Sequence, residues 1–235
     1  MVEDAKCIFS ISTHQSLPDY DGSSSIPYLS AADMTRCRML RSYDSGHASH
    51  NPTLIEAFRI AWADPGLFSS IEVGPELMQE ELVSAVDGYN NPTPQAIEEA
   101  YRAFGKDQRV CFLLSLGTGR AAVRSLNADG GALGQMIARD TESTAEQLKR
   151  RYARLHIYFR LSVDRNLDFH SALQAIEQRV GNISSLTSSF LETHDASDVL
   201  NRCLRSSYQA SHITMEGLCK SPRVSPDCIL LNKMG

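Results

Sequence analysis

An aspartate followed by a glycine, Asp87-Gly88, ends an apolar run over residues 82–86 that is typical of a β-strand. A carboxylate at the end of a strand can take a proton from a nucleophile on a neighbouring loop, and glycine permits the tight turn that this approach requires. Asp87 is therefore placed where a carboxylate could act as a general base, and Gly88 is the residue that supports its turn. The alternative is an ordinary Asp-Gly turn that carries no chemistry.

A second loop of interest is Gly117-Thr118-Gly119, which follows an apolar run over residues 110–116. Closely spaced glycines can cradle a phosphate, but neither the rest of a Rossmann signature nor a P-loop accompanies this pair. The pattern favours a turn that closes a buried strand. Ser115 lies inside that strand, where we expect burial rather than catalysis.

The segment between these two loops has the signals of a helix. Thr93 and Pro94 are typical of a first turn, apolar residues recur at helical spacing as far as Phe104, and Gly105 is a natural C-terminal cap. Strand, helix and strand in this order predict a βαβ unit, in which the two strands are parallel. Because the carboxyl ends of parallel strands share one edge of a sheet, we expect both loops at that edge.

Local patterns also predict the elements that precede this unit. Thr53 and Glu56 form a capping box at the start of a helix whose apolar stripe ends at Pro65-Gly66. Strands are predicted over residues 7–12 and 38–43, and the turn-forming residues of 18–30 predict an exposed loop.

After about residue 120 the pattern becomes helical. Ser143 and Glu146 form a second capping box, and the helix that follows carries a basic cluster over residues 149–154. We expect this cluster to be a solvated helix face, with a membrane or another anionic partner as the alternative. Two more helices are predicted, one over about 168–180 that stops at Gly181 and one between residues 198 and 207.

The composition excludes several classes of function. Of 235 residues, 42% are hydrophobic and 22% are charged, which is typical of a globular protein, and the net charge of −5 argues against a nucleic-acid partner. No apolar run is long enough for a transmembrane segment, and the N-terminus lacks the pattern of a secretory signal. The six cysteines are scattered, and Cys7 and Cys111 lie in apolar runs, so we expect a cytoplasmic location.

A series of motifs occurs in collinear order along the chain. They are Arg-Ser-Tyr-Asp at 41–44, Leu-Ile-Glu-Ala-Phe-Arg at 54–59, Ala-Asp-Pro-Gly-Leu-Phe at 63–68, Val-Asp-Gly-Tyr-Asn-Asn-Pro at 86–92 and Leu-Ser-Leu-Gly-Thr-Gly at 114–119. Asp-Thr-Glu-Ser-Thr-Ala at 140–145 and Ile-Tyr-Phe-Arg-Leu-Ser-Val at 157–163 follow them. This ordered set, over roughly residues 5–205, resembles the patatin-like phospholipases, in particular the fungal forms with a helical extension after the lipase domain.

The resemblance implies a serine acyl hydrolase that cleaves phospholipids or neutral lipids with a Ser–Asp dyad and without a metal or an organic cofactor. In such enzymes the serine lies on a Gly-x-Ser-x-Gly elbow, and Asp87 matches the aspartate of the dyad by position. The loop after Gly88 is shorter than in the family pattern. No Gly-x-Ser-x-Gly occurs in the 235 residues. We therefore expect a chain that is incomplete at its N-terminus, lacks the nucleophile and has little or no lipase activity alone.

Other residues of suitable type have surroundings that favour a structural interpretation. Asp129-Gly130-Gly131 spells the dyad motif more fully, but it follows the glycine pair and lacks the Asn-Asn-Pro, so we expect an ordinary turn. His47 and His50 are expected to be loop residues because no nucleophile elbow accompanies them. Without a Cys-x-x-Cys pair, a zinc site is not expected at Cys203, His212, Cys219 and Cys228. The aromatic residues expected to pack in the core or at its rim are Phe58, Trp62 and Phe68.

The expected fold is α/β, a partial patatin-like three-layer sandwich with a mostly parallel sheet and a helical extension. Residues 1–120 are expected to be the C-terminal part of the lipase domain, 121–219 the extension and 220–235 a flexible tail. The expected partner is a lipid ester substrate or a membrane surface. The alternative function is a non-catalytic fragment that binds lipid or a protein partner through its apolar surface and an exposed sheet edge.

Overall fold

The computed structural model describes residues 24–43, 52–65, 68–117, 140–163, 176–208 and 213–221. The chain divides into two compact units, which we describe separately. The antiparallel unit contains the described residues up to 103, together with residue 140. The parallel unit contains the described residues 104–117 and those from 141 onward.

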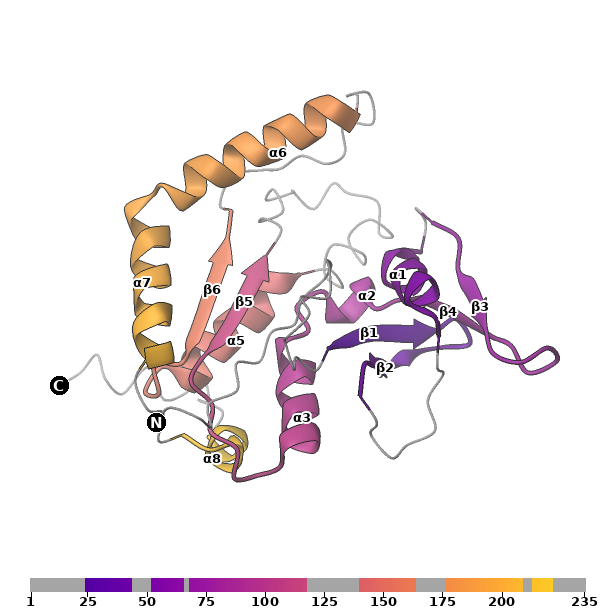
Figure 1. The fold of residues 1–235 in the computed structure, drawn as a ribbon, viewed down its shortest axis with the longest axis horizontal. Helices are drawn as coiled ribbons and strands as arrows, with labels where there is room; N and C mark the ends of the chain where they lie inside the picture. Colours follow the sequence, from indigo (N-terminus) through magenta and orange to yellow (C-terminus); the bar gives the residue numbers. More distant parts are fainter. Residues whose placement is uncertain are drawn as a thin grey trace, which may run out of the picture. The chain divides into compact units, whose positions relative to one another are not determined.

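The antiparallel unit is built on a four-stranded sheet with the order β2-β1-β4-β3, drawn from indigo to magenta in Figure 1. Each neighbouring pair is antiparallel, and the central pairing places Leu29 of β1 opposite Val83 of β4. The strands are β1 (Ser25–Ser30), β2 (Asp33–Arg41), β3 (Ile71–Val73) and β4 (Glu80–Ser84). The helices of this unit are α1 (Leu54–Trp62), α2 (Val86–Tyr89) and α3 (Thr93–Phe104).

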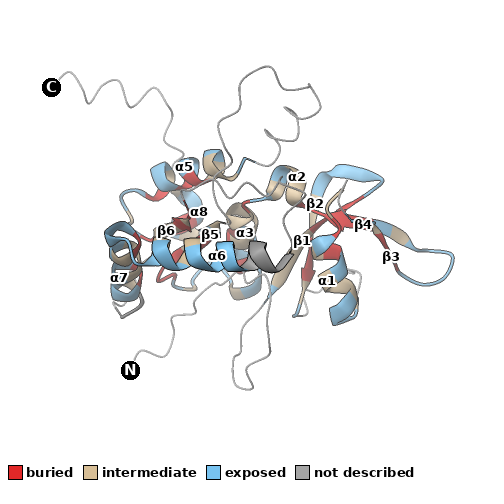
Figure 2. Ribbon diagram, turned by 90° about the horizontal axis from the view of Figure 1, so that it is seen from above, coloured by how far each residue is buried: buried red, intermediate tan, exposed pale blue. Residues whose placement is uncertain are grey.

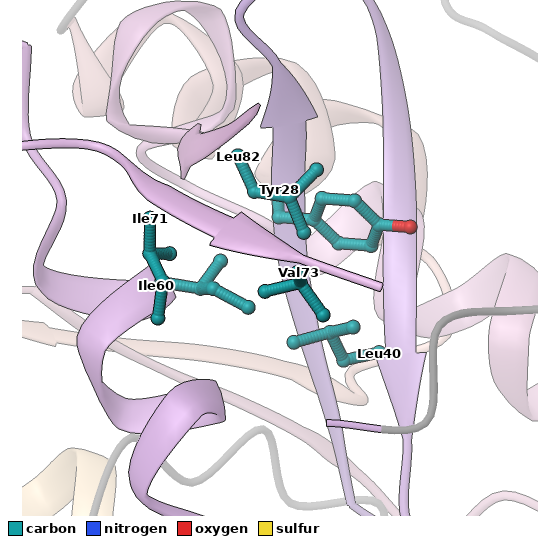
Figure 3. Close-up of a cluster of buried hydrophobic side chains, with 6 residues drawn as sticks. All are labelled: Tyr28, Leu40, Ile60, Ile71, Val73 and Leu82. Carbon is teal, nitrogen blue, oxygen red and sulfur yellow. The ribbon is translucent and has the colours of Figure 1, made fainter. Parts of the chain in front are cut away.

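Helix α1 starts at the predicted capping box and packs its inner face on the sheet. The hydroxyl of Thr53 accepts a hydrogen bond from the backbone N–H of Glu56, and the Glu56 carboxylate accepts one from the N–H of Thr53. Ile60 on this helix is fully buried. Figure 3 shows its side chain in a cluster contributed by α1 and all four strands, formed by Tyr28, Leu40, Ile60, Ile71, Val73 and Leu82.

The prediction of an exposed loop over residues 18–30 is wrong for residues 25–30, which form β1. Tyr28 and Leu29 are buried because β1 lies between β2 and β4 and therefore packs on both sides. The serines on either side of these apolar residues favour turns locally, but the pairing with two neighbours overrides that preference. Residues 18–23 lie outside the described residues.

The parallel unit contains a two-stranded parallel sheet of β5 (Leu113–Gly117) and β6 (Tyr158–Ser162), in which Leu114 lies opposite Phe159. Phe159 packs against Val199 and Cys203 of α7 (His194–Tyr208), whereas Arg160 contacts Glu142 of α5 (Thr141–Tyr152). Because successive residues of a strand point to opposite faces, α5 and α7 cover opposite faces of β6. The other helices are α6 (Ile176–Leu191) and α8 (Met215–Lys220).

Most buried residues of the antiparallel unit lie in its strands, whereas those of the parallel unit are shared among β5 and β6, the residues beside these strands, and the helices α5, α7 and α8. Figure 2 shows that most of α6 is exposed or intermediate. The expected positions of three aromatic residues are only partly confirmed. Phe58 is intermediate, but Trp62 and Phe68 are 64% and 61% exposed and do not belong to the core.

The predicted βαβ unit is not present. Strand β4 lies between β1 and β3 in the antiparallel sheet, while β5 pairs with β6, so β4 and β5 belong to different sheets. The mixed α/β class is confirmed, but the larger of the two sheets is antiparallel rather than mostly parallel. Within the expected helical extension, β6 is a strand, and α6 continues through Gly181 to Leu191 instead of stopping there.

Candidate functional site

Asp87 lies in the turn that follows β4, as its sequence position predicts. The strand ends at Ser84, and the backbone of Asp87 is extended within the short segment labelled α2, with φ −82° and ψ 109°. Gly88 follows with φ 91°, a left-handed value that an L side chain rarely adopts. Asp87 is partly exposed.

The residues around Asp87 fix this turn on the sheet. The N–H of Tyr89 donates to the carbonyl of Ala85 at 3.1 Å, and the Tyr89 hydroxyl donates to the carbonyl of Thr35 on β2 at 3.3 Å. Ala85 is buried with Leu29 and Val83, and Tyr89 packs against the same cluster. A Cβ at Gly88 would meet no atom within 4 Å, so glycine is required there for backbone conformation and not for space.

The structure does not unite the two predicted loops on one sheet. Asp87 follows a strand of the antiparallel sheet, whereas Gly117 ends β5 of the parallel unit. Thr118 and Gly119 lie outside the described residues. The expectation that both loops share the carboxyl edge of one parallel sheet is therefore wrong.

Several other candidates also lie outside the described residues, and these are His47, His50, Asp129, Gly130, Gly131, His212 and Cys228. Two members of the cysteine and histidine group are described, with Cys203 buried on α7 and Cys219 exposed on α8. Within the described ranges, no group of three or more histidine, cysteine, aspartate or glutamate residues is arranged to hold a metal ion. Ser115 is buried, as predicted from its place in an apolar strand.

The sequence analysis did not predict a polar cluster that lies near the carboxyl ends of β5 and β6. The side chain of Arg160 is only 4% exposed and donates hydrogen bonds to Ser115 Oγ at 2.8 Å and to Glu142 Oε1 at 3.2 Å. Nε of Arg160 and Oγ of Ser162 are buried and have no hydrogen-bond partner among the described residues. Gly117 makes room for this guanidinium, because a Cβ there would come 2.5 Å from Arg160 Nη2.

A cavity of about 370 Å³ lies within the parallel unit, at the amino end of β6. Its lining combines basic and aromatic side chains, and includes Lys149, Tyr152, His156, Phe159, Arg202 and Arg205. We refer to it below as the basic cavity. The sequence signals the lysine through the basic cluster on α5, but the arginines of α7 are about 50 residues away and only the fold brings them to it.

The basic cluster itself follows the expectation of a solvated helix face only in part. Lys149, Arg150 and Arg154 are exposed. Arg151 is instead partly buried and donates to the carbonyl oxygens of Cys219 at 2.7 Å and Ser221 at 3.2 Å. These bonds join the end of α5 to the end of α8.

In the part of the chain that the structure describes, no helix has the length and apolar character required to cross a bilayer. No family model, no curated protein and no solved structure matches this chain.

Proposed function

We propose that this chain carries the general-base half of a patatin-like lipid acyl hydrolase, with Asp87 as the base. The observation that supports the proposal is the placement of Asp87 in the turn after β4, partly exposed and followed by Gly88 with its φ of 91°. The order of the motifs along the chain supports the assignment to this family. The hydrogen bonds of Tyr89 to Ala85 and Thr35 hold the turn against the sheet.

In the proposed reaction the carboxylate of Asp87 takes the proton of a serine hydroxyl as the serine oxygen attacks the ester carbonyl. The protonated carboxyl then gives this proton to the alcohol that leaves, and an acyl-serine intermediate remains for hydrolysis by water. The serine must come from a second polypeptide segment, because the 235 residues contain no Gly-x-Ser-x-Gly. The chain alone is therefore expected to show no turnover of a fluorogenic short-chain ester.

The role of Asp87 is tested by adding the serine-bearing half of a patatin-like phospholipase as a separate polypeptide and measuring how fast a fluorophosphonate labels its serine. Asp87→Asn is expected to slow labelling about 100-fold or more, because the base that activates the serine is lost. Asp107→Asn is the matched control, since Asp107 is exposed on the parallel unit. Equal labelling rates with the wild-type chain and with Asp87→Asn, or labelling that does not respond to the chain at all, would exclude the proposed role.

A second candidate function is binding to a lipid surface, which a group of exposed apolar side chains on the antiparallel unit favours. Leu77 and Met78, in the turn between β3 and β4, are 99% and 77% exposed. Leu54, Ile55 and Trp62 of α1 are also exposed. Where exposed apolar side chains adjoin one another, they form a surface that is suited to contact with a membrane or a protein.

Sedimentation with phosphatidylcholine vesicles tests this second function. Leu77→Ser with Met78→Ser is expected to reduce the vesicle-bound fraction, because two exposed apolar side chains are removed. Leu191→Ser, which changes a half-exposed leucine of α6, is the control and is expected to leave binding unchanged. If neither the wild-type chain nor the control sediments with vesicles, the lipid-surface function is excluded and a protein partner becomes the better explanation of the apolar surface.

A further inference from the structure

The basic cavity gathers positive charge from two helices of the parallel unit. Lys149 comes from α5, and Arg202 and Arg205 come from α7. Among the described residues that line the cavity there is no carboxylate, although the chain as a whole has a net charge of −5. A cavity lined by several cations favours an anionic ligand.

The carboxylates that pair with these cations leave some of their N–H donors available to a ligand. Lys149 pairs with Glu146 at 2.8 Å and Arg202 with Asp198 at 3.7 Å, and all four side chains are substantially exposed. Among the described residues no carboxylate lies within ion-pair distance of Arg205. A guanidinium presents five N–H donors, so single ion pairs of this kind do not exhaust the donors of the two arginines.

A helix dipole explains part of this arrangement, because Lys149 and Arg205 both lie in the last turn of a helix. That explanation does not account for the convergence of α5 and α7 on one cavity. It also does not account for Arg202, whose ion pair at Asp198 lies one turn earlier on α7. The convergence is therefore better explained by a shared anionic ligand.

The aromatic side chains give the cavity an apolar surface beside its charges. The guanidinium of Arg202 lies 5.7 Å from the centre of the Phe159 ring, so one side chain offers a cation next to a flat apolar face. Tyr152 and Tyr158 also belong to the lining, and because their hydroxyl oxygens are buried, they contribute other parts of their side chains to it.

We propose that the basic cavity binds a phosphomonoester group, held by Arg202, Arg205 and Lys149, with the organic part of the ligand against Phe159. Arginine fits phosphate because its planar fork donates two parallel hydrogen bonds to two oxygens. The volume of about 370 Å³ lies at the lower end of the range for small-molecule sites, which suits one phosphorylated group of modest size.

Two arms test the binding and distinguish the sources of the phosphate. In the first, glycerol 3-phosphate is titrated into the full chain in an isothermal titration calorimeter. In the second, the chain is sedimented with phosphatidylcholine vesicles that contain or lack phosphatidic acid. Binding in the first arm indicates a soluble phosphomonoester, and binding only to the vesicles with phosphatidic acid indicates a lipid headgroup.

Substitutions of the lining residues test whether the ligand binds in the basic cavity. Arg205→Gln is expected to weaken binding about tenfold or more, and Lys149→Gln combined with Arg205→Gln to abolish it, because charge-assisted hydrogen bonds to phosphate are lost. Arg154→Gln is the matched control, since it removes the same charge from an exposed arginine outside the cavity lining. Circular dichroism and urea unfolding verify that each variant is folded, which their exposed positions favour.

Loss of binding in the cavity variants with retention in Arg154→Gln supports the proposal, in whichever arm binding occurs. Equal weakening in Arg154→Gln and Arg205→Gln would overturn it, because the effect would then follow net charge. Absence of binding in both arms at millimolar ligand would overturn it as well. None of these outcomes depends on Asp87, so the cavity and the hydrolase proposal fail or succeed separately.

Discussion

The guanidinium of Arg41 on β2 binds the carboxylate of Glu99 on α3 through two hydrogen bonds, Nε to Oε2 at 2.5 Å and Nη2 to Oε1 at 2.8 Å. The Tyr43 hydroxyl and Arg102 donate further hydrogen bonds to the same carboxylate, each at 2.8 Å. The Glu99 side chain is only 5% exposed, and that of Arg41 is 13% exposed. This network fixes α3 to the edge of the antiparallel sheet.

Removing Glu99 is expected to be severely destabilising. Glu99→Ala leaves the charge of Arg41 buried without its partner, and breaking such a pair costs about 3–5 kcal/mol in the free energy of unfolding. Glu98→Ala is the matched control, because Glu98 is exposed on the same helix and such a site changes stability by only about 0.5 kcal/mol. Urea unfolding of both variants measures the difference. Similar losses in the two variants would show that the buried network does not stabilise α3.

The same network predicts how stability depends on pH. Burial raises the pKa of Glu99, but the hydrogen bonds from Arg41 and Tyr43 and the charge of Arg41 more than offset it, so the pKa lies below its ordinary value of 4.5. A lowered folded-state pKa means that the stabilisation is complete above the unfolded-state value and is lost as the pH falls through the folded-state value. Urea midpoints are therefore expected to stay level from pH 7 to about 5 and to fall below that.

Glu99→Gln isolates this contribution, because it cannot titrate. Its urea midpoint is expected to be lower at neutral pH and to fall less steeply in acid than that of the wild-type chain. Asp33, with a pKa lowered by its hydrogen bonds from Thr35, remains in both proteins and contributes equally to both curves. If the urea midpoints of the two proteins fell equally steeply below pH 5, the loss of stability in acid would not be due to Glu99.

Gly117 is expected to tolerate no side chain. A Cβ there would come 2.5 Å from Arg160 Nη2 and 2.8 Å from Ser162 Oγ, and Arg160 is held by Ser115 and Glu142. Gly117→Ala is therefore expected to reduce the free energy of unfolding by about 1–3 kcal/mol through overpacking.

A second glycine provides the contrasting control for Gly117. Gly181 lies inside α6 and a Cβ there would meet nothing within 4 Å, so Gly181→Ala is expected to raise stability by about 0.5–1 kcal/mol. Urea unfolding measures whether each substitution raises or lowers the free energy of unfolding. A stabilising Gly117→Ala would indicate that the guanidinium of Arg160 does not occupy this position.

The cysteines are expected to react with iodoacetamide at very different rates. Burial raises the pKa of the Cys37 thiol from its ordinary value of 9.0 to about 11. At pH 8 this difference lowers the thiolate fraction, and with it the rate, about 100-fold. Cys219 is exposed, so peptide mass spectrometry is expected to find it modified long before Cys37. Equal rates at these two cysteines would show that β2 does not bury Cys37.

Local signals in the sequence predicted the helices of the antiparallel unit well. Thr53 and Glu56 form the expected capping box, and α3 ends at Phe104 before Gly105, whose φ is 81°. These features depend on residues within one turn of each other, so a pattern in the sequence is enough to find them. The position of Asp87 after β4 was predicted for the same reason.

Features that depend on distant residues were missed. Nothing in the local sequence of residues 25–30 indicates that β1 is covered on both sides, because its neighbours β2 and β4 come later in the chain. The expectation that β4 and β5 share a sheet was also wrong, since a strand-helix-strand order does not specify that the two strands pair in one sheet. The basic cavity requires α5 and α7 together and has no local signal at all.

The pairing of β5 with β6 joins residues 113–117 to residues 158–162. A shortened protein that stopped at residue 120 would therefore keep β5 and discard its hydrogen-bonding partner. Its uncovered backbone groups would be available to other molecules, and such strands promote intermolecular association. Recombinant production of the region before residue 120 is expected to give soluble material only when the expressed chain continues past residue 163.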